Sequence, residues 1–215
     1  MLDILYKDHQ IIALNKAPGI AVQPDKTGDV TLQAQAEAYC RQPLHLAHRL
    51  DRPVSGVVVY AKTKTAMTAL TEQFRSRAVE KTYLAVVQNL PPEPEGTLIH
   101  FLRKNEAKNI SIVASESDAG AERAELHYRL LGSSERYHLL EIQLITGRHH
   151  QIRAQLAAIG CPVKGDVKYG FRRSNRDRSL HLHAWKLAFD HPVSGERVQL
   201  EAKLPEDPVW QAFGI

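Results

Sequence analysis

The sequence predicts an α+β fold, in which helices flank a mixed, mostly antiparallel β-sheet. Apolar segments of strand length clearly outnumber helical patterns, and two helical patterns separate runs of strands instead of alternating with single strands. With 215 residues and 43% hydrophobic content, the chain is large enough to bury a substantial core. We therefore predict one domain that spans residues 1–215.

The N-terminal part is expected to start with a hairpin. Ile4–Tyr6 and Ile11–Asn15 are short apolar segments, and the polar residues between them predict a turn. Residues 20–23 predict another short extended piece. Thr31–Arg41 is rich in helix formers and has apolar residues at helical spacing, so we expect the first helix there.

The middle of the chain predicts a buried strand followed by an amphipathic helix. Val57–Ala61 is apolar almost throughout, which is typical of a strand that is buried on both faces. Apolar residues recur at four-residue steps from Ala66 to Phe74, which predicts the next helix. Thr63 or Thr65 can cap its N-terminus. Thr82–Val87 predicts another strand.

The second half of the chain returns to strand patterns. Asn105–Glu122 is polar and is short of bulky apolar residues after Val113, so it is expected to be an exposed hairpin tip or a mobile loop. The remaining predicted elements are strands at Ala124–Leu131, His138–Leu144, Leu180–Phe189 and Val198–Lys203, and a helix at His149–Ile159.

Composition narrows the class of protein. The net charge of +4 and a pI near 9.1 favour a polyanionic partner, although many proteins carry such a surplus. Only two cysteines occur, Cys40 and Cys161, far apart in the sequence and without metal-type spacing, which argues against a disulfide framework or a cysteine-built zinc site. No apolar run approaches the roughly 20 residues that cross a bilayer, and early acidic residues argue against a secretory signal. We expect a cytoplasmic protein without a membrane partner.

The segment His48–Gly56 carries the strongest chemical signal. It places Asp51 in a loop that leads directly into the apolar strand. Arg49 and Arg52 flank this carboxylate, and nearby cations favour the ionised form that a nucleophile or base needs. From the residues alone, an aspartate that is paired with its arginines in a structural turn is the better explanation of the pattern, because ion pairs commonly perturb carboxylates without catalysis.

The same segment resembles a known family. His48–Asp51, followed after two residues by Val54–Gly56, resembles the signature of RluA-type pseudouridine synthases, which usually have threonine in place of Val54. Five further segments resemble the family's other motifs in the expected order: Asn15–Gly19, Lys81–Tyr83, Thr146–Arg153, Gly165–Gly170 and Leu180–Ala184. The resemblance therefore covers almost the whole chain.

The resemblance implies an enzyme that isomerises uridine to pseudouridine in ribosomal or transfer RNA. Asp51 would drive cleavage of the bond between ribose and uracil, either by attacking the ribose or through a glycal intermediate. Arg153 would pair with Asp51, and Tyr83 would lie against the uracil. The reaction needs no redox step, so we expect no cofactor and no metal. We also expect a monomer that lacks the S4 RNA-binding domain of many relatives.

Substrate recognition is expected to involve cationic side chains and an apolar contact. A uridine within structured RNA must be extruded to reach a pocket. Arg49 and Arg52 would fill the vacated position or hold the backbone, and Arg148 would contact a phosphate. Leu182 would line the pocket, although simple core packing explains it as well. The basic loop Arg172–Arg178 could follow the phosphates or be merely solvated.

Two other classes of function compete with this interpretation. A metal-dependent RNA hydrolase would use some of the histidines, although their spacing matches no recognised metal motif. These residues are His45, His48, His149, His150, His181 and His183. A non-catalytic RNA-binding module would not need Asp51, so the intact set of aspartate, tyrosine and arginine argues against it.

Overall fold

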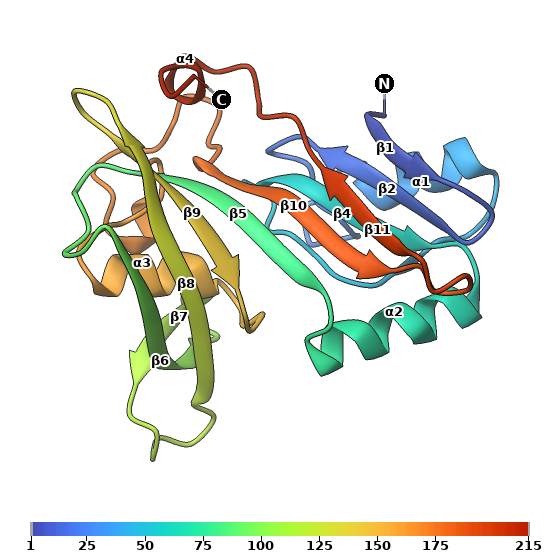
Figure 1. Cartoon of the computed structure of the whole chain (residues 1–215), viewed down its shortest axis with the longest axis horizontal. Coiled ribbons are helices and arrows are strands. Elements are labelled where there is room, and N and C mark those ends of the chain that lie inside the picture. Colours follow the sequence, from blue (N-terminus) through green and yellow to red (C-terminus); the bar gives the residue numbers. More distant parts are fainter. Residues whose placement is uncertain (1, 215) are drawn as a thin grey trace. The chain divides into compact units, whose positions relative to one another are not determined.

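The computed structural model describes residues 2–214 and groups them into two compact units (Figure 1). The first unit comprises the described residues up to Lys81 together with His183–Pro205. The second comprises Thr82–Leu182 and the described residues from Glu206 onward. The single domain expected over residues 1–215 stays a prediction, because one catalytic domain can contain two compact units.

The first unit is built on a mixed set of strands. Its strand order is β1-β2-β4-β10, β11 pairs with β10, and β3 pairs with β4. The β4–β10 pair is parallel, whereas the pairs β1–β2, β2–β4, β3–β4 and β10–β11 are antiparallel. The elements are β1 (Ile4–Lys7), β2 (Ile11–Lys16), α1 (Leu32–Cys40), β3 (His45–Leu46), β4 (Ser55–Ala61), α2 (Lys64–Ser76), β10 (Leu182–Asp190) and β11 (Arg197–Glu201).

The core of the first unit follows from the alternation of side chains along β2 and β4. Ile11 and Val59 lie in one hydrophobic cluster with Leu70 of α2, so the helix covers this face of the strands. Tyr60 points to the opposite face, and its buried hydroxyl donates to the carbonyl of Val22 at 2.8 Å. Both faces of β4 are therefore buried, as its continuous apolar sequence predicts.

Both helices of the first unit start at a threonine cap. The hydroxyl of Thr31 accepts the amide of Ala34, and that of Thr63 accepts the amide of Ala66, each at 3.2 Å. The predicted helix starts are confirmed, and Thr63 rather than Thr65 is the cap of α2. The short extended piece expected at 20–23 does not join the sheet, because the carbonyls of Ala21 and Val22 accept the first amides of α1.

The second unit is an antiparallel sheet with the order β5-β9-β8-β6-β7. Its elements are β5 (Glu80–Val87), β6 (Glu95–Asn105), β7 (Ile110–Ala114), β8 (Glu122–Ser133), β9 (His138–Leu144), α3 (Gln151–Ala158), the 3-10 helix η1 (Val167–Tyr169) and α4 (Pro208–Gln211). The expected α+β class with a mixed, mostly antiparallel sheet is confirmed.

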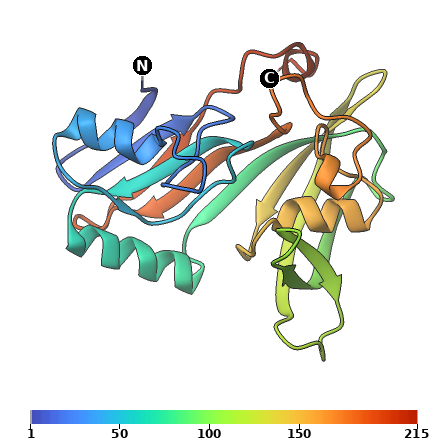
Figure 2. The same cartoon turned by 180° about the vertical axis from the view of Figure 1, so that it is seen from behind.

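Two strands of the second unit lie where the sequence did not predict them. β6 starts within Pro91–Gly96, a segment that contains three prolines. β7 lies inside the polar stretch Asn105–Glu122 that was expected to be a tip or a mobile loop. That expectation is wrong for β7, although the turn between β6 and β7 is an exposed tip. α3 packs on this sheet (Figure 2), where Ala154 contacts a small cluster with Leu102 and Ala124.

None of the helices in the described residues 2–214 is sufficiently long and apolar to cross a bilayer.

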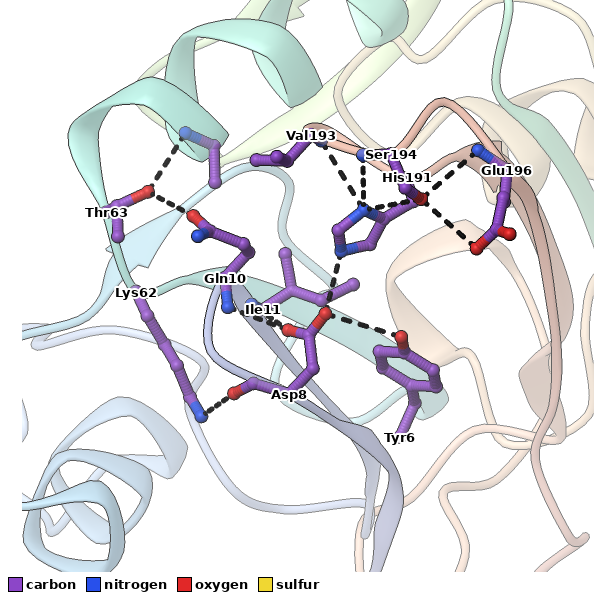
Figure 3. Close-up of polar contacts among 11 residues, drawn as sticks. Tyr6, Asp8, Gln10, Ile11, Lys62, Thr63, His191, Val193, Ser194 and Glu196 are labelled. Atoms are coloured by element: carbon purple, nitrogen blue, oxygen red, sulfur yellow. Dashed lines mark hydrogen bonds and ion pairs between the residues drawn. The ribbon is translucent and has the colours of Figure 1, made fainter.

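A polar network closes the β1–β2 turn of the first unit (Figure 3). The carboxylate of Asp8 accepts the amides of Gln10 and Ile11 at 2.7 and 2.8 Å, and it contacts Nε2 of His191 at 2.7 Å. The hydroxyl of Tyr6 also donates to it. Burial would raise the pKa of Asp8, but the two amides and His191 together bring it below its ordinary value.

Replacing Asp8 with asparagine is expected to destabilise the fold by about 1–3 kcal/mol at pH 7, because the amide cannot accept all of these hydrogen bonds. A carboxylate with a lowered folded-state pKa contributes stability above its unfolded-state pKa of about 3.9, and this contribution is lost as the pH falls further. Denaturant unfolding of the wild-type and Asp8→Asn proteins should therefore show a difference in the free energy of unfolding that narrows below about pH 4. A difference that stays constant down to pH 2 would contradict this account.

Candidate active site

Asp51 lies in the loop that leads into β4. Its carbonyl accepts the amide of Val54 at 3.0 Å, which closes a tight turn. Leu50 and Val54 are buried on either side of this turn, whereas Asp51 is half-buried and Arg49 is exposed. The loop is therefore anchored by apolar residues and keeps its carboxylate partly accessible.

A buried lysine, Lys16, is hydrogen-bonded to the backbone of this loop. Lys16 ends β2 and is fully buried, and its ammonium group donates to the carbonyls of Ala17, Ile20 and Arg52 at 3.1, 2.9 and 3.0 Å. The amide of Gly19 donates to the same Arg52 carbonyl at 2.8 Å. The Asn15–Gly19 turn thus fixes the residue that follows Asp51.

Lys16 is also an electrostatic neighbour of the candidate catalytic group. Burial lowers the pKa of Lys16 to about 7, the Asp51 carboxylate acts against this shift, and Arg52 adds to it. The three carbonyl acceptors match the three protons of an ammonium group. Lys16 is therefore a buried cation that interacts electrostatically with the Asp51 carboxylate.

His48 anchors the other side of the loop. Its Nε2 accepts the amide of Val59 at 3.1 Å, and its ring stacks on Phe74 of α2 with the ring centroids 4.8 Å apart. Burial, together with the nearby Lys81, lowers the pKa of His48 to about 4. The ring is therefore neutral near pH 7, as its acceptor role requires, and it ties the loop to β4 and α2.

The start of β4 is fixed to β10 at very close range. Ser55 pairs with His183 and Gly56 with Ala184 in the parallel register. The hydroxyl of Ser55 lies 2.8 Å from Nδ1 of His183, whose Nε2 lies 3.2 Å from the carbonyl of Ala202. Burial lowers the pKa of His183 to about 4, so the neutral ring can donate from Nε2 and accept from Ser55.

Arg52 bonds to acidic residues of its own unit. Its guanidinium group contacts Asp25 at 2.8 Å and Asp29 at 2.7 Å, and it donates to the hydroxyl of Thr27. Hydrogen bonds from Thr27 and from Arg52 lower the pKa of Asp25 to about 2, so the acidic loop stays ionised near neutral pH. An RNA phosphate would therefore compete with these carboxylates for Arg52.

In the second unit, the Thr146–Arg153 segment builds the turn that starts α3. The side-chain carbonyl of Gln151 accepts the Thr146 hydroxyl at 2.7 Å and the amide of Arg148 at 3.0 Å. Its side-chain amide donates to the carbonyl of Glu125 on β8. The threonine and the glutamine thus set the direction of α3. The Arg148 side chain itself pairs with Glu122 at 2.6 Å.

The other predicted residues of the second unit lie on α3 and along β5. Arg153 is buried on α3 and forms an ion pair with Asp166. Tyr83 is half-buried on β5, opposite Ile142 of β9. Leu182 is buried and follows His181, whose carbonyl accepts the amide of Val86 on β5.

The structure thus brings Arg49, Asp51 and Arg52 together in one anchored loop of the first unit. It places Tyr83, Arg148, Arg153 and Leu182 in the second unit. The pairing of Arg153 with Asp51 stays a prediction. Sequence reasoning did not select Lys16 or Asp166 as site residues, although both lie in segments that it singled out.

The histidines of the metal-hydrolase alternative mostly have other partners. His48 and His183 bind within the first unit as described above, and Nε2 of His181 lies 2.9 Å from Asp207. His149 and His150 lie near Ser111 and Tyr169 respectively. Among residues 2–214, no three His, Cys, Asp or Glu side chains come together as metal ligands would.

Comparisons with known proteins show the family to which the chain is similar. The family model described as RNA pseudouridylate synthase matches residues 10–158. The chain is 34% identical to tRNA pseudouridine synthase C of Pectobacterium carotovorum subsp. carotovorum, over 98% of this chain and 61% of that protein. It is 34% identical to ribosomal large subunit pseudouridine synthase C of Rickettsia bellii, over 94% of this chain and 68% of that protein.

A solved structure gives the same result for the fold. Human RNA pseudouridylate synthase domain containing 1 is 26% identical and superimposes with a TM-score of 0.82, over 99% of this chain and 87% of that one. The family match spans most of the chain, and the anchored aspartate loop lies within it. The chain therefore belongs to the RNA pseudouridylate synthase family and is an RNA pseudouridine synthase.

Proposed function

We propose that this enzyme isomerises uridine to pseudouridine in transfer or ribosomal RNA, with Asp51 as the catalytic carboxylate. The observation that carries the proposal is the anchored loop around Asp51. Lys16 holds the carbonyl of Arg52, and His48 holds the opposite end of the loop. A carboxylate that is fixed before the substrate arrives needs little reorganisation in the reaction.

The proposed chemistry starts at the ribose. Asp51 promotes cleavage of the bond between ribose and the uracil nitrogen, the base turns, and a new bond forms to a uracil carbon. That carbon then loses its proton, and the released ring nitrogen carries one in the product. This isomerisation transfers no electrons to a carrier, so the proposal includes no cofactor and no metal. Lys16 contributes by holding the carbonyl of Arg52, which fixes the backbone next to Asp51.

The remaining roles are proposed on the family resemblance. Arg153 acts as the basic partner of Asp51, and Tyr83 lies against the uracil. Arg49 is exposed beside Asp51, which suits it to replace an extruded base or to hold the backbone. Leu182 offers an apolar surface to the base.

The substrate is proposed to be transfer or ribosomal RNA because the two bacterial relatives are named for these RNAs. Both compact units are proposed to belong to one catalytic domain, since the family model covers residues from each. The cytoplasmic location and the monomeric state remain predictions.

Mapping of pseudouridines in total RNA, from cells with and without the gene, tests this function. The proposal predicts that one or a few sites in transfer or ribosomal RNA lose pseudouridine without the gene. They should regain it with the wild-type gene but not with a gene that encodes Asp51→Asn. Identical maps in the presence and absence of the gene would refute the proposal.

Phosphate contacts are proposed for Arg148, Arg52 and the loop Arg172–Arg178. Asn175 anchors this loop, because it contacts Lys164 at 2.7 Å and the carbonyl of Ser179 at 2.9 Å. Arg172, Arg173 and Arg176 are exposed, and none of them forms an ion pair with another described residue. An anchored loop with unpaired arginines suits the binding of phosphates.

Replacing Arg172, Arg173 and Arg176 with alanine is therefore expected to weaken RNA binding and to make it less sensitive to salt. Each lost phosphate contact should reduce the slope of log affinity against log salt by roughly 0.7 to 0.9. The single-turnover rate at saturating RNA should change little. Arg75→Ala, which removes an exposed arginine already paired with Glu72, is the control. An unchanged slope in the triple variant would show that the loop is only solvated.

A further inference from the structure

Arg153 is held by a second carboxylate in its own unit. Its Nε donates to one oxygen of Asp166 at 2.6 Å, and its Nη2 donates to the other oxygen at 2.9 Å. Only 5% of the Arg153 side chain and 1% of the Asp166 side chain are exposed. This is a bidentate, charge-assisted pair, which fixes the plane of the guanidinium group as well as its position.

Asp166 is itself rigidly placed. Its amide donates to the carbonyl of Val163 at 3.0 Å, and its carbonyl accepts the amides of Tyr169 and Phe171 at 3.1 and 3.0 Å. The preceding Gly165 has a φ of +89°, and a side chain there would lie 2.7 Å from the Asn175 amide. These hydrogen bonds and the crowding at Gly165 fix the backbone from which the Asp166 carboxylate extends.

The ring of Tyr169 holds Arg153 from another side. The guanidinium carbon lies 5.0 Å from the ring centroid, within the range of a cation–π interaction. The Tyr169 hydroxyl accepts the amide of Ser111 at 2.7 Å and lies 3.0 Å from Nδ1 of His150. The Gly165–Gly170 segment thus supplies two groups that orient Arg153, one charged and one aromatic.

Stability alone is a weak explanation for this arrangement. Taking two charges out of water costs several kcal/mol per ion, and apolar side chains of similar volume often stabilise a core equally well. The pair also fixes the orientation of the Arg153 guanidinium group. Because Asp166 occupies the Nε–Nη2 edge, Nη1 is held on the side of the guanidinium group that points away from Asp166.

We propose that Asp166 is a positioning residue of the reaction, which orients the guanidinium group of Arg153 for its interaction with the catalytic carboxylate. This inference rests on the proposed function, in which Arg153 is the partner of Asp51. Asp166 does not touch the substrate in this account, and its effect on the rate passes entirely through Arg153.

Asp166→Glu is the most informative variant, because it keeps the charge and lengthens the side chain by one methylene group. The displaced guanidinium group should lower the single-turnover rate at saturating RNA by up to about 10²-fold, while the RNA dissociation constant stays within a few-fold. A merely structural ion pair would tolerate glutamate without loss of rate in protein that remains folded. Asp8→Asn, at the other end of β2 from Lys16, is a control that should lower stability but not the rate.

A double-mutant cycle separates positioning from folding. Arg153→Ala leaves the buried Asp166 carboxylate without its partner, so adding Asp166→Asn to this variant should raise the melting temperature. The rate should remain as low as in Arg153→Ala alone. If the rate recovered together with stability, Asp166 would have only a structural role.

The outcomes also separate this inference from the proposed function. A wild-type rate in folded Asp166→Glu, with Asp51→Asn inactive, would overturn the role of Asp166 and leave Asp51 in place. A wild-type rate in Arg153→Ala would remove both Arg153 and Asp166 from the reaction. If Asp166→Glu and Asp166→Asn both failed to fold, the pair would be required for folding and the positioning role would be rejected. Activity in Asp51→Asn would instead refute the proposed function itself.

Discussion

Asp51→Asn should abolish pseudouridine formation and leave RNA affinity within a few-fold of wild type. Asparagine keeps the shape of the side chain but lacks the charge that a nucleophile or base requires. We expect a loss of at least ~10³-fold in the single-turnover rate, the scale seen when a catalytic nucleophile is removed. Quantifying pseudouridine after a single turnover measures the rate, and titration of the same RNA measures the affinity.

Loss of the Asp51 charge will also affect Lys16. The Asp51 carboxylate opposes the effect of burial, which lowers the pKa of Lys16. Without this carboxylate, the pKa of Lys16 should fall further in the asparagine variant. Thermal unfolding must show that the variant remains folded at the assay temperature. Asp8→Asn is the matched control, because it makes the same chemical change in the β1–β2 turn, outside the loop that carries Asp51. A folded Asp51→Asn protein with wild-type turnover would exclude Asp51 from catalysis.

Gly56→Ala should have the largest effect on folding. Gly56 has a φ of +115°, and a Cβ atom there would lie 2.2 Å from the carbonyl oxygen and 2.6 Å from the nitrogen of Ala184. Backbone atoms cannot move aside as a flexible side chain can, so β4 and β10 would have to separate. We expect a loss of more than about 4 kcal/mol in the free energy of unfolding, or no folded protein.

Gly120→Ala provides the matched control. Gly120 also has a positive φ, of +76°, but no atom lies within 4 Å of the added Cβ. This variant should lose only the cost of the left-handed backbone, about 1–2 kcal/mol. Equal melting temperatures for the two variants would show that the approach of β4 to β10 does not limit the fold.

Local sequence patterns predicted the elements whose burial is simple. β4 is apolar throughout, and Thr31 and Thr63 cap their helices as short-range rules require. β7 was missed because Ile110–Ala114 is short and partly exposed, and it lies within an otherwise polar stretch. Residues 20–23 are of types that favour strands, but the carbonyls of Ala21 and Val22 accept hydrogen bonds from the first amides of α1.

The sequence predicts a candidate site residue when that residue belongs to a recognised motif. It predicts less well the residues whose role depends on contacts with distant parts of the chain. Asp51 can be selected as a candidate from its motif alone. The role of Lys16 depends on the carbonyl of Arg52, which is 36 residues away in the sequence. Asp166 likewise acquires its role from Arg153 on α3. A charged residue inside a recognised turn is the signal that points to both.

The most direct measurement uses purified protein and total RNA from cells that lack the gene. Wild-type protein, with a chelator present and no cofactor added, should form pseudouridine at the same transfer or ribosomal RNA sites that are lost in those cells. Asp51→Asn should form none, and Asp8→Asn should act like wild type. Absence of pseudouridine with the wild-type protein, activity that requires an added transition metal, or equal product from Asp51→Asn would contradict the assignment of Asp51 as the catalytic carboxylate of a metal-free synthase.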